Sequence, residues 1–219
     1  TIQFAAELQL TASQICDGGG AIFSMPSGRV EWSLPLGIVA VKTILEELSA
    51  GGFLFFATHP GGAYTNLTGD VLKLPWVTND PCDLNEGELT RVSALNLSAR
   101  KARILASRLG RLGLHTARAY LPYNGLWAVD CTHRDADKGV AAARIAAAAR
   151  VDLKDCVAIG DSYNDLPMLS VCGVAISMGG APSEVLKMAD HIVPPVEDDG
   201  LAIAITEIIL PLINTPASP

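Results

Sequence analysis

The sequence predicts an α/β fold built on a parallel sheet, and three observations support this prediction. Strands and helices alternate through the last third of the chain. The 219 residues are 49% hydrophobic and only 18% charged, so the chain can bury a sizeable core. At roughly 150 residues for a usual domain, the length corresponds to one large domain or to one domain that carries an insert.

The first third of the chain mixes helices, short strands and tight turns. Residues 1–13 place Phe4, Leu8 and Ala5 on one helical face. A short strand, ICD, is then expected to enter a glycine turn. A β-hairpin is predicted next, with AIF and RVEWSL as its strands and SMPSG between them. The pattern IVAVKTILEELS predicts an amphipathic helix at about 36–49, and FLFFATH, between glycine pairs, predicts a strand.

The middle of the chain differs in charge from the rest. Residues 79–88 hold four acidic residues, whereas 89–129 hold none and carry seven of the 16 basic residues. Five of these lie on a predicted helix: Arg100, Lys101, Arg103, Arg108 and Arg111. A solvated helix face is the favoured interpretation, and recognition of an anion is the alternative.

In the last third of the chain, predicted strands and helices alternate as they do in βαβ units. A helix from Lys138 to about Arg150 precedes the apolar strand CVAIG at 156–160. A helix through DLPMLS, the strand GVAIS, a helix at 182–189, the strand HIV and a final helix at 200–210 follow. Strands that alternate with helices at this spacing predict a parallel sheet.

Composition excludes several classes of partner. The net charge is −7 and the isoelectric point is near 5.0, so no global positive field attracts a nucleic acid or a membrane surface. Mean hydropathy is high, at +0.32, but no run of about 18 apolar residues that could span a bilayer exists. Five cysteines without a CxxC pair are typical of reduced thiols, so we expect a cytoplasmic protein whose partners are small molecules.

The strongest local signal is GDSYNDLPML at 160–169, directly after an apolar strand. Ligands of an open α/β sheet collect beyond the carboxyl ends of the strands. Asp161 and Asp165, with Asn164 between them, could hold a hard cation such as Mg²⁺ through oxygen ligands. The structural alternative is that Asp161 or Ser162 only caps the following helix.

The second element is Lys138, which opens the helix VAAARIAAAA. A cation at the positive end of a helix dipole is electrostatically disfavoured unless an anion is held there. Lys138 could therefore act as a point charge on a phosphate group. An ordinary exposed lysine is the alternative interpretation.

Together these two elements resemble the haloacid dehalogenase superfamily of phosphatases, whose third motif is a lysine that opens a helix and whose fourth is GDxxND. The 22 residues from Lys138 to Gly160 resemble the branch with a large α+β cap. That branch includes Cof-type sugar phosphatases, sucrose-phosphate phosphatase and mannosyl-3-phosphoglycerate phosphatase. Three further stretches carry the resemblance: ICDGGGAIF, VAISMGGAPSEVLKMADHIV and EDDGLAIAI.

The resemblance implies a domain layout. It predicts a Rossmann-like parallel-sheet core formed by 1–33 and 132–219, with an α+β cap domain inserted at 34–131. Two turns depart from the family pattern: M-G-G-A at 178–181 stands for M-G-N-A, and Asp17-Gly18 stands for Glu-Asn. The first and second family motifs, including D-x-D-G-[ST], do not occur in the sequence. We therefore expect a first β-α-β unit of roughly 40 to 50 residues to be missing ahead of Thr1.

The resemblance also implies a mechanism and a role for each site residue. Asp161 would ligate Mg²⁺, Asp165 would contribute to the metal site by orienting its water shell or would orient Lys138, and Lys138 and Asn164 would hold the phosphate. Lys138 and Asp165 are thus the expected catalytic residues of this chain. The aspartate nucleophile, which would form an aspartyl-phosphate, is absent, so the chain alone is expected to be inactive.

The predicted function is Mg²⁺-dependent hydrolysis of a small phosphomonoester. The substrate would be a sugar phosphate or a compound like mannosyl-3-phosphoglycerate. The alternative is a non-catalytic relative that serves as a binding or interaction module. A nucleotide-binding protein is a weaker third interpretation, because neither G-x-x-x-x-G-K-[ST] nor G-x-G-x-x-G occurs.

Overall fold

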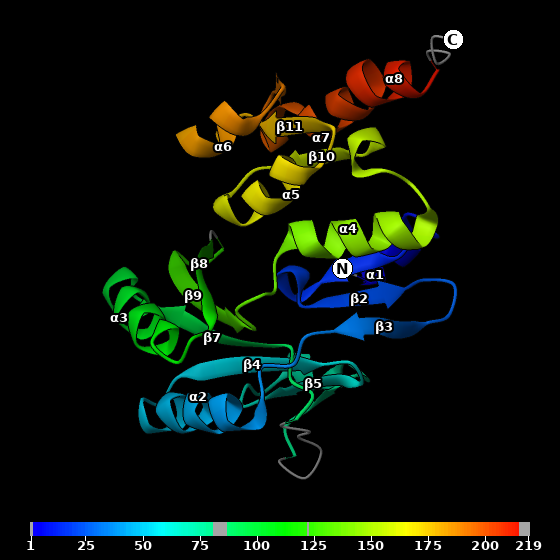
Figure 1. Ribbon diagram of the computed structural model, residues 1–219. Coiled ribbons are helices and arrows are strands. Elements are labelled where there is room, and N and C mark those ends of the chain that lie inside the picture. The colour runs from blue at the N-terminus through cyan, green and yellow to red at the C-terminus, as the bar shows by residue number, and fades with distance from the viewer. Residues whose placement is uncertain (1, 81–86, 122, 215–219) are drawn as a thin grey trace. The chain divides into compact units, whose positions relative to one another are not determined.

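The computed structural model describes residues 2–80, 87–121 and 123–214, and the chain forms two compact units (Figure 1). The N-terminal unit comprises residues 1–136 and the C-terminal unit comprises residues 137–219. Each unit has its own sheet system and its own buried apolar cluster. Across the described ranges, no helix combines the length and the apolar character that crossing a membrane requires.

The N-terminal unit begins with helix α1 (Ile2–Glu7) and a small antiparallel sheet in the order β1-β2-β3. The predicted hairpin is confirmed by the pairing of β2 (Ala21–Ser24) with β3 (Arg29–Ser33), and β1 (Gln14–Cys16) pairs with β2. The expected apolar face of the first helix is wrong in part. Ala5 is 2% exposed, but Phe4 and Leu8 are 66% and 70% exposed. The helix is only two turns long, so its sequence pattern could not fix which side meets the core.

A six-stranded sheet forms the larger part of the N-terminal unit, in the order β6-β5-β4-β7-β9-β8. All neighbouring strands are antiparallel except β5 and β6. The strands are β4 (Leu54–His59), β5 (Gly62–Thr65), β6 (Val77–Thr78), β7 (Arg91–Leu97), β8 (His115–Leu121) and β9 (Leu126–Thr132). Mostly antiparallel strands combined with helices are typical of the α+β architecture that was predicted for 34–131.

Two amphipathic helices cover one face of this sheet, α2 (Ile38–Ala50) and α3 (Ala99–Gly110) (Figure 1). Val41, Ile44 and Leu48 of α2 and Ala102, Leu105 and Leu109 of α3 are fully buried. They pack in one cluster with strand residues of alternating position: Phe55, Ala57, Val92, Ala94, Val129 and Cys131. Because successive strand residues point to opposite sides, the other strand residues belong to the opposite face.

The C-terminal unit confirms the predicted βαβ alternation. Its parallel sheet has the order β10-β11-β12, formed by Val157–Gly160, Val174–Met178 and His191–Val193. Helices α4 (Lys138–Ala149), α5 (Leu166–Val171) and α6 (Ser183–Met188) alternate with these strands. Ala158, Leu169, Ala175 and Val185 form the centre of its apolar cluster.

The last helix continues beyond the predicted end at 210. It runs from α7 (Gly200–Ile203) through a π-helical segment (Ala204–Ile209) to α8 (Leu210–Asn214). The amide of Leu210 donates to the carbonyl of Ile205, which is an i→i+5 bond. Pro211 has no amide hydrogen to donate, so a wider turn just before it is a physically reasonable way to continue the helix.

The predicted layout of core and cap stays a prediction. The compact N-terminal unit contains both 1–33, expected in the core, and 34–131, expected as the cap. Cys16, Cys131, Cys156 and Cys172 are free thiols. Cys82 lies outside the described residues.

Candidate active site

The candidate site lies where β10 ends, in the turn from Gly160 to Asp165. Tyr163–Asp165 forms one turn of 3-10 helix, and α5 follows at Leu166. Ser162 is the N-terminal cap of this turn and forms a capping box with Asp165. A capping role, the structural alternative considered from the sequence, is therefore real for Ser162.

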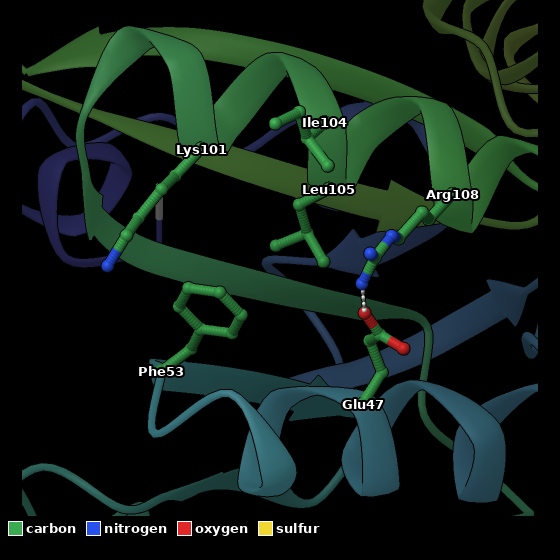
Figure 2. Close-up of a pocket in the computed structure, with 6 residues that line it drawn as sticks. All are labelled: Glu47, Phe53, Lys101, Ile104, Leu105 and Arg108. Atoms are coloured by element: carbon green, nitrogen blue, oxygen red, sulfur yellow. Dashed lines mark hydrogen bonds and ion pairs between the residues drawn. The ribbon is translucent and has the colours of Figure 1, made fainter.

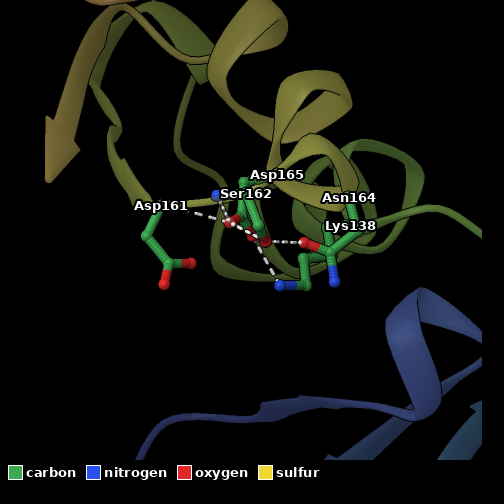
Figure 3. A network of polar contacts seen from close by, with 5 residues as sticks. All are labelled: Lys138, Asp161, Ser162, Asn164 and Asp165. Carbon is green, nitrogen blue, oxygen red and sulfur yellow. Dashed lines mark hydrogen bonds and ion pairs between the residues drawn. The ribbon is translucent and has the colours of Figure 1, made fainter. Parts of the chain in front are cut away.

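The carboxylate of Asp165 is the centre of the polar network (Figure 3). Its Oδ1 accepts a hydrogen bond from Nζ of Lys138 at 2.5 Å. Its Oδ2 accepts from the backbone amides of Asp161 at 3.0 Å and Ser162 at 3.1 Å. The Ser162 hydroxyl lies 3.1 Å from the same oxygen and 2.5 Å from Oδ1 of Asn164. These hydrogen bonds bring together the side chains of Lys138, Ser162, Asn164 and Asp165.

Electrostatics keep the Asp165 carboxylate ionised. The side chain is almost fully buried, and burial by itself raises the pKa of a carboxyl group. The hydrogen bond and the charge of Lys138, together with the amides of Asp161 and Ser162, outweigh burial and lower the pKa of Asp165 below its ordinary value. Near neutral pH the site therefore contains a fixed carboxylate and an ammonium group.

Lys138 is the first residue of α4, as predicted. Asp137 caps this helix by accepting from the amide of Val140 at 2.7 Å. The anion that Lys138 meets in this structure is Asp165. The Lys138 side chain keeps 28% of its surface exposed, so its ammonium group can also approach a ligand.

Both oxygens of Asp165 already accept hydrogen bonds from protein donors. Of the two predicted roles for Asp165, the structure supports positioning of Lys138 more than a contribution to a metal site. Direct ligation of a metal by Asp165 would require some of these bonds to break.

Asp161 is placed differently from Asp165. It is exposed, and its carboxylate points away from the network, to which it contributes its backbone amide (Figure 3). Within the described ranges, no group of three or more His, Cys, Asp or Glu side chains could bind a metal by itself. Mg²⁺ usually takes only one or two protein carboxylates and fills its other positions with water and phosphate oxygens. The single exposed carboxylate of Asp161 fits that pattern.

Two glycines complete the site, and the sequence predicted no role for them. A Cβ on Gly160 would lie 2.5 Å from Cβ of Asp165, and one on Gly139 would lie 2.6 Å from the carbonyl oxygen of Pro167. Both glycines therefore allow close approach of the elements that carry the site. The Ser-x-x-Asp pattern of Ser162 and Asp165 was the available signal for the capping box.

The two departures from the family pattern lie where the backbone is left-handed. Gly180, in M-G-G-A, has a φ of 84°, and Asp17 and Gly18 have φ values of 52° and 67°. Glycine adopts this region freely, and asparagine and aspartate adopt it more readily than other residues with a side chain. The glycines at 180 and 18, where the pattern has asparagine, therefore suit the backbone that these positions adopt.

The basic side of helix α3 is largely exposed to solvent. Nη1 of Arg108 pairs with Oε1 of Glu47 at 2.7 Å, and Nζ of Lys101 lies 5.8 Å from the ring centroid of Phe53 (Figure 2). These residues border a small cavity of about 80 Å³. Arg100, Arg103 and Arg111 are exposed. The favoured interpretation from the sequence is supported, and anion recognition by α3 stays a prediction.

A sequence model described as haloacid dehalogenase-like hydrolase matches residues 1–205. The chain therefore belongs to this family. It is similar to the phosphatase YwpJ of Bacillus subtilis, with 33% identity over 73 residues, or 33% of this chain and 26% of YwpJ. The matched segments span only about a quarter of such curated relatives, 22% in YkrA of the same organism and 26% in YwpJ.

Solved structures share the fold. A haloacid dehalogenase-like hydrolase from Bacteroides thetaiotaomicron matches with a TM-score of 0.78 and 23% identity, over 94% of this chain and 81% of that chain. The subclass IIB sugar phosphatase BT4131 matches with a TM-score of 0.71 and 15% identity, over 95% of this chain and 80% of that chain. Identities this low show the fold alone. They confirm the predicted α/β fold of this superfamily.

Proposed function

We propose that the protein is a Mg²⁺-dependent phosphatase that hydrolyses a small phosphomonoester. One observation carries the proposal: the buried carboxylate of Asp165 holds the Lys138 ammonium group at the carboxyl end of β10, where the exposed Asp161 keeps its own carboxylate outside the network. A fixed cation and a free carboxylate at the same strand end can bind a phosphate group and a hard metal ion together. Family membership and the phosphatase YwpJ among its relatives support the same reaction.

Each residue then has a separate task. Lys138 donates hydrogen bonds to phosphate oxygens and offsets the negative charge that gathers on them during transfer. Asp165 is a positioning residue, because it acts on the phosphate through Lys138. The side-chain amide of Asn164 is a candidate donor to the phosphate, while its Oδ1 is held by Ser162.

Asp161 would hold the Mg²⁺ ion, with water and phosphate oxygens completing its coordination. When bound, the ion supplies Lewis-acid chemistry and a template for the phosphate. In the family, the motif D-x-D-G-[ST] supplies the aspartate nucleophile. This motif does not occur among the 219 residues. We therefore propose turnover for a protein in which the chain is accompanied by that motif, and an inactive phosphate and metal site for the chain alone.

The proposed partner is a small phosphorylated metabolite, with a sugar phosphate as the first candidate. The fold neighbour BT4131 is named as a sugar phosphatase, which supports this choice. We propose a cytoplasmic location, supported by the unpaired Cys16, Cys131, Cys156 and Cys172. The acidic net charge of −7 supports a protein without nucleic-acid or membrane partners.

Binding measurements on the chain test the proposed site. Calorimetric titration with inorganic phosphate in the presence of Mg²⁺ should show binding that Lys138→Ala weakens about 10- to 100-fold, as expected for loss of a hydrogen bond to a charged group. Asp161→Asn should remove the effect of Mg²⁺ on phosphate affinity. Lys154→Ala and Asp155→Asn, at exposed positions of the same unit, are matched controls. Equal phosphate affinity in wild type and Lys138→Ala would overturn the site assignment.

A further inference from the structure

Two of the free thiols stand before neighbouring strands of the parallel sheet in the C-terminal unit. Cys156 directly precedes β10, and Cys172 directly follows α5, two residues ahead of β11. The candidate active site lies at the opposite, carboxyl end of β10. Both cysteines are only partly buried, and neither has a task in the proposed phosphate and metal site.

Backbone contacts bring the segments that precede the two strands together. The amide of Val174 donates to the carbonyl of Cys156 at 3.1 Å. A Cβ on Gly173 would collide with the carbonyl oxygen of Lys154, so glycine is required for this close approach. Cys172 is therefore fixed beside the part of the chain that carries Cys156.

The strand register sets the separation of the two cysteines. Val157 pairs with Val174 in the parallel ladder, so the same register places Cys156 opposite Gly173 and one position from Cys172. Both cysteines have extended backbone, with φ and ψ of −100° and 147° at Cys156 and of −81° and 152° at Cys172. A strand spacing of about 4.8 Å and a rise of about 3.3 Å per residue then give a Cα separation of roughly 6 Å. Disulfides usually join Cα atoms that lie about 4.4 to 6.8 Å apart.

The two side chains belong to the same side of the sheet. Cys172 packs against the apolar cluster that contains Ala158 of β10. Cys156 lies two residues before Ala158, and alternate strand residues point to the same side. Burial raises the pKa of the Cys172 thiol and the nearby Cys156 raises it further, which agrees with two neighbouring sulfur atoms. Separation and direction therefore both suit a disulfide.

We propose that Cys156 and Cys172 form a peroxide-sensitive dithiol whose disulfide closes the segment that carries the candidate active site. Residues 156–172 comprise β10, the turn with Asp161 and Asp165, and α5. A cross-link between the two ends of a segment restricts it when it opens, and so stabilises its closed form. Cytosolic disulfides are usually transient and redox-sensing, so a reversible bond is compatible with the proposed location. The inference goes beyond the proposed phosphatase function and does not depend on it.

The oxidation is a balanced two-electron reaction in which hydrogen peroxide is the oxidant. The Cys156 thiolate attacks one peroxide oxygen, the O–O bond breaks, and a sulfenic acid and one water molecule result. The sulfur of Cys172 then attacks the sulfenic sulfur, which forms the S–S bond and expels the second oxygen as water. We assign the second step to Cys172, because its raised pKa lowers the thiolate fraction available for the first attack.

Peptide mapping of the intact chain tests whether the bond forms. After treatment with hydrogen peroxide, proteolysis without reductant should yield a peptide that joins Cys156 to Cys172, and dithiothreitol should remove it. Cys156→Ser and Cys172→Ser should each abolish this peptide. Cys16→Ser, which changes a partly buried thiol of the other unit, is the matched control and should retain it. Absence of the linked peptide, with the thiols reduced, oxidised singly or joined to another cysteine, would overturn the proposal.

Hydrogen exchange tests the effect of the bond on the site. The amides of Asp161 and Ser162 donate to Asp165, so their exchange reports opening of the turn that carries the site. Exchange at both amides should be at least tenfold slower in the oxidised chain than in the reduced chain, and peroxide should not slow it in Cys172→Ser. Equal rates in the oxidised and reduced chains would refute closure of the segment. Neither measurement involves phosphate binding, so a failure of the proposed phosphatase function would leave both results unchanged.

Discussion

Replacement of Lys138 by methionine tests the electrostatic structure of the site. The change removes the ammonium group but keeps an unbranched side chain. Asp165, 3% exposed, then loses the donor to its Oδ1 but keeps the amides of Asp161 and Ser162 at Oδ2.

A lost hydrogen bond to a charged group costs about 1.5 to 3 kcal/mol. The remaining donors keep the cost below the roughly 3 to 5 kcal/mol of a fully uncompensated buried charge. Because the Lys138 side chain is 28% exposed and partly screened, we expect a loss of about 2 kcal/mol in the free energy of unfolding at pH 7.

The pH dependence of this loss has a defined sign. The folded-state pKa of Asp165 is lowered from 3.8, so its stabilisation is present above that value and is lost as the pH falls through the lower folded-state pKa. In Lys138→Met, burial remains without the ammonium group, so the folded-state pKa rises. The difference in stability between wild type and variant should therefore be complete near pH 7 and shrink below about pH 4.

Urea unfolding followed by far-ultraviolet circular dichroism measures these free energies between pH 3 and pH 7. Lys154→Met is the control, because Lys154 and Asp152 form a pair that is 74% and 71% exposed and should contribute less than about 1 kcal/mol. A loss in Lys138→Met that equals the control, or one that does not change with pH, would refute the reasoning.

Three further outcomes follow from packing and exposure. Gly160→Ala should lower the free energy of unfolding in urea by about 1 to 3 kcal/mol, because the added Cβ would lie 2.5 Å from the Cβ of Asp165. Gly110→Ala is the control and should be neutral or stabilising, because Gly110 lies in a helix and its added Cβ would have its nearest contact at 3.6 Å. Equal effects of the two substitutions would contradict this reasoning. Burial raises the pKa of Cys131 to about 12, so a thiol reagent at pH 8 should label the partly exposed Cys156 much faster, and equal labelling rates would contradict its burial. Arg108→Ala should change stability by less than about 1 kcal/mol, because its side chain is 60% exposed; a larger loss in urea unfolding would assign α3 a structural role beyond a solvated face.

Local sequence patterns predicted the elements that position the site. The apolar strand CVAIG, followed by GDSYND, placed Asp161 and Asp165 at the end of a parallel strand, and the structure agrees. The start of α4 at Lys138 was also predicted correctly. These features depend on periodicity and turn chemistry within about ten residues, which a single sequence records.

Features that depend on long-range contacts could not be predicted in this way. The pairing of Lys138 with Asp165 joins residues 27 positions apart and was expected only from the family resemblance. The exposure of Phe4 depends on where α1 packs. The row of polar residues on the sheet, in which Arg91 pairs with Thr58 and Thr132 and Ser93 pairs with Asp130, requires the register of β4, β7 and β9. A shift of one residue would turn Arg91 and Asp130 toward the helices.

Phosphate release tests the central claim most directly. The whole product of the gene, including any D-x-D-G-[ST] motif encoded ahead of these residues, would be assayed with an aryl phosphate, with and without Mg²⁺. The account predicts release that requires Mg²⁺ and is abolished by Asp161→Asn. Binding of phosphate and Mg²⁺ without release would favour the non-catalytic alternative, and release that continues without Mg²⁺ or in Asp161→Asn would contradict the account.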